Sequence, residues 1–149
     1  MKSATATKNT ANGPATAQAW LGVRAANSVQ LIEAIGAGFP FATLERVRKE
    51  TGLPLDRLGS AIGLSARTLT RRKKEKKLSA AESDRLVTLT RLLTQAIVLF
   101  EGRKPSALRW FVQPNCALGN LSPLEMAATE TGAREVENLI GRLEHGVFS

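Results

Sequence analysis

Apolar residues recur at helical spacing through most of this chain. The clearest run follows the 3, 4, 3 spacing of one helical face, at Leu86, Leu89, Leu93, Ala96, Ile97 and Phe100. This pattern predicts a long helix over about residues 80–101, and Ser79 with Glu82 three positions later supplies a capping box for its start. No segment alternates apolar and polar residues over four or more positions. The sequence therefore predicts an all-α fold.

Shorter helices are predicted on both sides of this long one. Before it we expect a helix that carries Val29, Leu31, Ile32 and Ile35 and stops at Gly36, Gly38 and Pro40. A second helix is expected over Phe41–Thr51, where Gly52 ends it. A third follows over Leu55–Ile62, and after a turn at Gly63 a fourth begins with Ser65 as its N-cap. After it we expect a short helix from Pro105 that carries Leu108, Trp110 and Phe111, and then a loop over Pro114–Gly119. The next predicted helix runs from Ser122-Pro123 to Gly132, with Glu125 at its third position. The last one runs from about Ala133 to His145.

Residues 1–17 consist mainly of Ala, Thr, Asn and Gly and have no periodic apolar pattern. Because they offer little apolar surface to offset the entropy of ordering, we expect a disordered tail there. We divide the rest into N-terminal helices with a DNA-binding region over residues 18–78 and a helical domain for dimerisation and partner binding over residues 79–149. The chain of 149 residues is long enough to bury a core without disulfides, and its single cysteine, Cys116, suits a reducing compartment.

The segment around residues 55–77 matches a helix-turn-helix, a motif that needs a small residue where its two helices touch and a turn residue that tolerates positive φ. Placing the turn at Gly63 puts Gly59 at the helix crossing and Leu58, Ile62, Leu64 and Leu69 on the inward positions. The last inward position falls on Arg72, which is an imperfect match.

Charge supports a nucleic-acid partner at this motif. The net charge is +8, and seven of the basic residues lie between Leu64 and Leu78 against one acid, Glu75. A basic run alone is more often a solvated helix face, but the turn pattern before it favours DNA. We expect Ser65, Arg67, Thr70 and Arg71 to face the major groove, with Arg67 and Arg71 on bases or phosphates. The phosphate contacts then fall to Arg72, Lys73, Lys74, Lys76 and Lys77.

The C-terminal half of the sequence is more specific to one protein family than the helix-turn-helix is. It contains A-x₂-W at Ala107–Trp110 and then PNCALGNLSPLEMAATETGAREVENLIGRLEHGVFS to the end. This resembles the antitoxins of the RES–Xre toxin–antitoxin family and their mycobacterial MbcA-type relatives, which carry W-x₃-P-N-x-A-L-G-G-x-T-P-L-E, T-E-x-G-A-x-x-V and a terminal R-I-E-x-G-V-Y/F-S. The family's S-x-R-T-L-x-R-R is matched by Ser65 to Arg72. Departures are Asn120 for a glycine, Ser122 for threonine and Leu143 for isoleucine; Asn tolerates the left-handed conformation, so we expect the turn to survive.

The resemblance implies a Xre/Cro-like helix-turn-helix domain that binds operator DNA and represses its own operon. It also implies a C-terminal domain that blocks the active site of a RES-domain toxin, an enzyme that in this family degrades NAD⁺. We assign toxin contacts to Asn120, Glu125, Glu130, Glu137, Gly146, Val147, Phe148 and Ser149. Residues 121–149 reverse the charge balance, with five Glu against Arg134 and Arg142. Phe148 can enter a nucleotide pocket or fold back on its own helix, and the sequence favours neither.

Catalytic and metal sites are disfavoured. Glu125, Glu130 and Glu137 lie on predicted amphipathic helices without the paired setting that acid–base catalysis needs. Cys116 and His145 lack further soft ligands for zinc and any group that would orient the imidazole. We therefore expect no catalytic residue, metal, cofactor or small-molecule substrate, and Trp20, Trp110 and Phe111 are interpreted as core or interface packing.

The location and assembly follow from the same features. No run of about 18 apolar residues and no apolar core after Lys2 and Lys8 is present, so we expect a cytoplasmic protein without a membrane span or secretory signal. A helix-turn-helix usually reads two half-sites, so we expect a homodimer. The long helix contributes its Leu86, Leu89, Leu93 and Phe100 face either to the dimer or to the monomer's own core. The alternative function is a regulator without a toxin partner.

Overall fold

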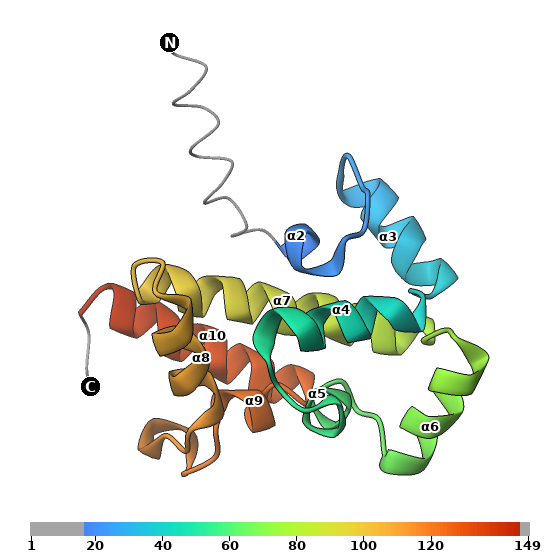
Figure 1. Cartoon of the computed structure of the whole chain (residues 1–149). Coiled ribbons are helices and arrows are strands. Elements are labelled where there is room, and N and C mark those ends of the chain that lie inside the picture. Colours follow the sequence, from blue (N-terminus) through green and yellow to red (C-terminus); the bar gives the residue numbers. More distant parts are fainter. Residues whose placement is uncertain (1–16, 147–149) are drawn as a thin grey trace.

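The computed structural model describes residues 17–146, and the ordered elements in this range are helices (Figure 1). In chain order they are α2 (Ala17–Leu21), α3 (Ser28–Ala37), α4 (Phe41–Thr51), α5 (Leu55–Ala61), α6 (Ala66–Glu75), α7 (Ala80–Leu99), α8 (Lys104–Val112), the 3₁₀ turn η2 (Cys116–Leu118), α9 (Pro123–Met126) and α10 (Glu130–Glu144). Two isolated β-bridges, Pro40 with Lys77 and Asn115 with Leu121, join loops without forming a strand. The predicted all-α fold is confirmed. Of the expected tail, residues 1–16 lie outside the described range, and Ala17 already belongs to α2.

Helix α7 runs through the centre of the molecule and contacts α2, α3, α8 and α10 (Figure 1). Its Leu86, Leu89, Leu92 and Leu93 side chains are 1% exposed or less. The leucine face of α7, which could have formed a dimer interface, is therefore buried in the monomer's own core. Ser79 starts the helix as predicted, because its hydroxyl accepts from the Glu82 N–H at 3.1 Å and Glu82 Oε1 accepts from the Ser79 N–H at 2.8 Å.

One hydrophobic core connects the two halves of the chain. It includes Leu44, Val47 and Leu58 from α4 and α5, and Val136 and Ile140 from α10, together with the α7 leucines. Trp20 and Phe111 are buried in it, as predicted, and Trp110 lies against Phe100 with ring centroids 6.1 Å apart. The division of the chain at residues 78 and 79 stays a prediction.

The sequence misplaced the boundary between the last two helices. We predicted one helix from Ser122 to Gly132 and another from Ala133, whereas α9 ends at Met126 and α10 begins at Glu130. Thr129 caps α10 by accepting from the Gly132 N–H at 3.0 Å, so Gly132 lies in the first turn of α10 and terminates nothing. It is a glycine because a Cβ there would lie 1.9 Å from the Met126 carbonyl oxygen.

Helix α3 also differs from its prediction. It continues through Gly36 and ends at Ala37, where Gly38 takes a φ of 86°. Leu31 and Ile35 pack against the core, but Val29 and Ile32 are 63% and 65% exposed. The apolar residues of this helix therefore lie on two faces, and only one of them is covered by the molecule.

Candidate DNA-binding and toxin-binding surfaces

Helices α5 and α6 form the predicted helix-turn-helix. Leu58, Ile62 and Leu64 are buried, and Gly63 turns the chain at a φ of +87°. A Cβ on Gly59 would lie 3.3 Å from the Leu69 methyl groups, so a glycine lets the two helices cross closely. The motif alignment from the sequence is confirmed at its turn and at its helix crossing.

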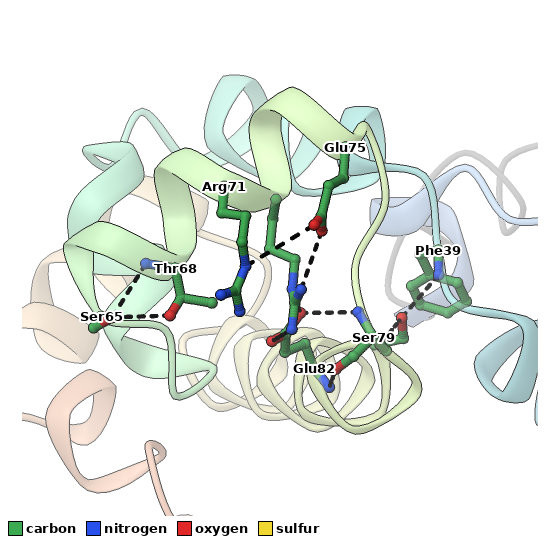
Figure 2. Close-up of polar contacts among 9 residues, drawn as sticks. Phe39, Ser65, Thr68, Arg71, Glu75, Ser79 and Glu82 are labelled. Carbon is green, nitrogen blue, oxygen red and sulfur yellow. Dashed lines mark hydrogen bonds and ion pairs between the residues drawn. The ribbon is translucent and has the colours of Figure 1, made fainter.

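Helix α6 begins directly after this turn. The Ser65 hydroxyl accepts from the Thr68 N–H at 3.2 Å and donates to the Thr68 hydroxyl at 3.0 Å (Figure 2). The predicted N-cap is therefore present, and it uses the Ser65 side chain internally. The Thr70 hydroxyl donates to the Ala66 carbonyl at 3.1 Å.

A row of exposed cations follows the chain along α6 and past its end, with Arg67, Arg71, Lys73 and Lys74 in the helix and Lys76 and Lys77 after it. Arg71 lies 4.0 Å from Glu75, and both side chains are at least half exposed, so this ion pair is weak. The row thus remains available to a polyanion.

Arg72 behaves differently from its neighbours. Its Nε and Nη2 donate to the two carboxylate oxygens of Glu82 at 2.8 and 2.9 Å, and its Nη1 donates to Glu75 at 3.1 Å. Its side chain is only 20% exposed. The expected phosphate contact by Arg72 would require this bidentate pair to break, so the structure gives Arg72 a supporting role. Arg72 occupies the last inward position of the motif, where the sequence match is imperfect, and the Glu82 carboxylate of α7 neutralises its charge.

The electrostatics of this pair are those of a fixed ion pair. The hydrogen bond with Glu82 raises the pKa of Arg72 far above its ordinary value. Burial alone would raise the pKa of Glu82, but the hydrogen bonds from Arg72 and from the Ser79 N–H outweigh it and lower that pKa. The Glu82 carboxylate therefore binds both to α6, through Arg72, and to the start of α7, through the Ser79 N–H (Figure 2).

The C-terminal surface begins with a tight loop between η2 and α9. Gly119 and Asn120 have φ values of 67° and 68°, and the Asn120 N–H donates to the Asn115 carbonyl at 2.9 Å. The left-handed conformation expected of Asn120 is confirmed, and its side chain is exposed.

The three glutamates assigned to toxin binding lie on two different surfaces. Glu125 forms the predicted capping box, and the hydrogen bond from the Ser122 N–H lowers its pKa. It lines a hollow with Arg57 and Ala66 of the helix-turn-helix. Glu130 and Glu137 line another hollow between α7 and α10. Gly146 is the last described residue, and Val147, Phe148 and Ser149 lie outside the described range.

Sequence reasoning missed two arginines of α7 at this second hollow. Arg91 forms an ion pair with Glu137, which also accepts from the Gln95 amide at 3.2 Å. Arg85 donates to the Ala127 carbonyl at 2.7 Å, between α9 and α10. Their partners are more than 40 residues away along the chain, so no local spacing could have identified them.

Residues 17–146 contain no group of three or more His, Cys, Asp or Glu side chains placed to hold a metal ion. Cys116 is exposed, and the His145 ring faces the Gly141 carbonyl of its own helix. Within the same residues, no helix is both long and apolar enough to cross a membrane.

Comparison with known proteins finds two family matches in this chain. Residues 30–91 match the antitoxin Xre-like helix-turn-helix domain, and residues 95–146 match the antitoxin Xre/MbcA/ParS C-terminal toxin-binding domain. The antitoxin Xre of Yersinia enterocolitica is 37% identical over 130 residues, which cover 87% of this chain and 88% of that protein. The antitoxin Xre of Photorhabdus laumondii is 34% identical over 116 residues, covering 77% and 78%. The chain therefore belongs to the Xre antitoxin family, with an Xre-like helix-turn-helix domain and a C-terminal toxin-binding domain.

Proposed function

We propose that this antitoxin represses its own operon through α6 and neutralises a RES-domain, NAD⁺-degrading toxin by blocking its active site in the cytoplasm. The observation that carries the DNA half is the row of exposed cations on an N-capped helix directly after the Gly63 turn. The toxin half is supported by the match of residues 95–146 to a toxin-binding domain.

On DNA, α6 would enter the major groove with its first turns. Arg67 and Arg71 would contact guanine edges or phosphates, while the Ser65 and Thr70 hydroxyls, which already donate within α6, would accept from base amino groups. Lys73, Lys74, Lys76 and Lys77 would supply phosphate contacts. Arg72 would hold α6 on α7 instead of touching DNA.

The test is an operator gel shift with Arg67→Ala/Arg71→Ala. Each lost base contact should cost about 1–3 kcal/mol, so the double variant should lose specific binding while still inhibiting the toxin. Arg109→Ala is the matched control, because this arginine is exposed on α8, outside the motif. If the double variant shifts operator DNA as well as the control does, α6 is not the reading helix.

On the toxin, we assign contact to the exposed Asn120, to Glu125, Glu130 and Glu137, and to Gly146 with the last three residues of the chain. The two hollows and the end of α10 would lie against the toxin, and Phe148 with the terminal carboxylate would occupy its nucleotide pocket. Glu130 is held only by an exposed Arg134 at 3.2 Å, so it can exchange partners at little cost.

Co-expression with the neighbouring toxin gene tests this half. Deleting Val147–Ser149 should restore growth arrest and loss of cellular NAD⁺ while operator binding persists. Burying a Phe ring is worth roughly 2–3 kcal/mol, which corresponds to a loss of inhibition of about two orders of magnitude. Full protection by the truncated chain would place inhibition on the body of the domain. The absence of any toxic neighbour would leave the alternative, a regulator without a toxin.

A further inference from the structure

Helix α6 carries one acid within its basic run. Glu75 is the only acidic residue between Leu64 and Leu78, a segment with seven basic residues, and it is the last residue of the helix. A negative charge is unfavourable at a helix C-terminus, and it also repels the phosphates of DNA. A carboxylate at this position therefore works against both the helix and its general affinity for DNA, and its contacts with neighbouring side chains show what offsets these effects.

The Glu75 carboxylate lies between two arginines. Its Oε1 accepts from the Arg72 Nη1 at 3.1 Å, and its Oε2 lies 4.0 Å from the Nε of Arg71 (Figure 2). Arg72 already has a bidentate partner in Glu82, which neutralises its charge. The negative charge of Glu75 is therefore left for Arg71. Charges of alternating sign thus lead from Glu82 on α7, through Arg72 and Glu75, to Arg71.

The two ends of this series differ in their exposure to solvent. The Arg72 and Glu82 side chains are 20% and 13% exposed, whereas those of Glu75 and Arg71 are 50% and 57% exposed. A separation of 4.0 Å allows an ion pair but is too long for a hydrogen bond, so Glu75 attracts the Arg71 guanidinium without locking it. In the free protein the solvent screens this attraction. In a DNA groove less water surrounds the pair, and the attraction becomes stronger.

The nitrogen that faces Glu75 determines which donors Arg71 has left. Arginine carries five N–H donors, one on Nε and four on the two Nη atoms. With its Nε toward Glu75, Arg71 keeps both Nη atoms for a bidentate contact with the O6 and N7 of a guanine. A guanidinium that turned freely could instead bind the nearest phosphate oxygen, a contact that carries no sequence information.

Arg67, the other exposed arginine assigned to base contacts, lacks such a neighbour. Within residues 17–146, no acidic side chain forms an ion pair with Arg67. The residue four positions later, which is its neighbour on the helix surface, is Arg71 and carries a like charge. Only the DNA contact of Arg71 should therefore depend on Glu75.

We propose that Glu75 is a positioning residue that orients Arg71 toward one guanine of the operator, and that it thereby raises sequence specificity while lowering general affinity for DNA. The proposal rests on the proposed DNA binding by α6. Glu75 acts through Arg71 and needs no base contact of its own. Its removal should therefore tighten binding to DNA of any sequence and relax the preference for a single base pair.

The first experiment selects binding sites from a pool of random duplex DNA with the parent, Glu75→Gln and Arg71→Ala. The parent should select guanine at a base pair that Arg71→Ala no longer specifies, and Glu75→Gln should relax this same base pair and no other. The affinity for the site selected by the parent, relative to a scrambled duplex of the same length, should fall about tenfold in Glu75→Gln, because one bidentate base contact supplies discrimination of this order. The affinity for the scrambled duplex itself should rise.

Asp56→Asn is the matched control for the lost charge. Asp56 is exposed on α5 of the same motif, and its Oδ1 accepts from the Arg57 N–H at 3.0 Å, a hydrogen bond that an asparagine can keep. This variant should tighten binding to the selected site and to the scrambled duplex by the same factor, and it should leave every base preference unchanged. Urea unfolding verifies that both variants are folded.

A double-mutant cycle tests whether Glu75 acts through Arg71. In an Arg71→Ala background, Glu75→Gln should leave the ratio of the two affinities unchanged. A further fall of the ratio in that background would overturn the proposal, because Glu75 would then act on DNA without Arg71.

Unchanged base preferences in Glu75→Gln would overturn the proposal too, with or without a loss of stability, because Glu75 would then only support the fold through Arg72. Failure of the proposed DNA binding by α6 is distinguishable from this outcome. In that case Arg71→Ala itself would relax no base pair, whereas failure of the Glu75 proposal alone leaves the effect of Arg71→Ala in place.

Discussion

At the residue scale, one carboxylate connects α6, the helix proposed to read DNA, to the body of the molecule. Glu82 accepts from both the Arg72 guanidinium of α6 and the N–H of Ser79, which caps α7. Both side chains of the ion pair are at most 20% exposed, so the pair is screened less by solvent than the surface pair between Arg71 and Glu75. Arg72 is thus part of the fold, although it lies in the middle of a basic run.

Glu82→Ala should therefore destabilise the protein by about 2–3 kcal/mol, because it removes a cap and leaves a poorly solvated guanidinium without its main partner. Urea unfolding at pH 7 checks the value, and Glu101→Ala, on a side chain 81% exposed, is the control. An effect no larger than that of the control would mean that Arg72 is solvated and free to reach DNA.

The same pair predicts a pH dependence. Because the folded-state pKa of Glu82 is lowered, its contribution to stability is complete above its unfolded-state pKa and is lost as the pH falls through the folded-state value. The difference in stability between the parent and Glu82→Ala should therefore shrink below about pH 4. Urea unfolding of both proteins between pH 7 and pH 3 measures it, and a constant difference would contradict the assignment.

At the element scale, the contact between α9 and α10 depends on one missing side chain. A Cβ at Gly132 would lie 1.9 Å from the Met126 carbonyl oxygen, a backbone atom that cannot move aside. This close approach fixes the angle at which α10 leaves the Thr129 cap.

Gly132→Ala should destabilise the protein by about 2–3 kcal/mol and weaken toxin binding, because the helices must separate to admit the methyl group. Gly141→Ala is the matched control: it lies on the same helix with nothing within 4 Å of its Cβ, and it should stabilise α10 by about 0.5–1 kcal/mol. Thermal unfolding followed by circular dichroism compares the two, and equal melting temperatures would exclude the clash.

At the scale of the whole molecule, α7 joins both binding surfaces to one core. It carries Glu82 toward α6, Arg85 toward α9 and Arg91 toward α10, and its leucines are buried between them. A continuous core of this kind favours cooperative unfolding.

Leu92→Ala should therefore lower the free energy of unfolding by about 2–5 kcal/mol. It should also lower, by the same amount, the temperatures at which DNA binding and toxin binding are lost. Calorimetry with DNA-binding and toxin-binding assays at increasing temperature is the test. Two separate transitions, one for each activity, would show that the halves fold independently at the predicted division between residues 78 and 79.

Most of the helices and the helix-turn-helix motif could be predicted from local patterns in the sequence. Helical spacing gave α7 to within two residues, and local signals gave the caps at Ser65, Ser79 and Ser122, because a cap depends on residues three positions apart. The helix-turn-helix was equally readable, since its turn glycine and helix crossing lie within one short segment.

Contacts between side chains that lie far apart along the chain became visible only in the tertiary structure. Glu82, the bidentate partner of Arg72, and the partners of Arg85 and Arg91 lie 10 to 46 residues away along the chain, so these contacts follow from how α7 packs and not from local spacing. The same packing buried the leucine face of α7 and left Val29 and Ile32 uncovered. Periodicity identifies an apolar face, but only the positions of neighbouring elements decide whether the molecule itself covers it.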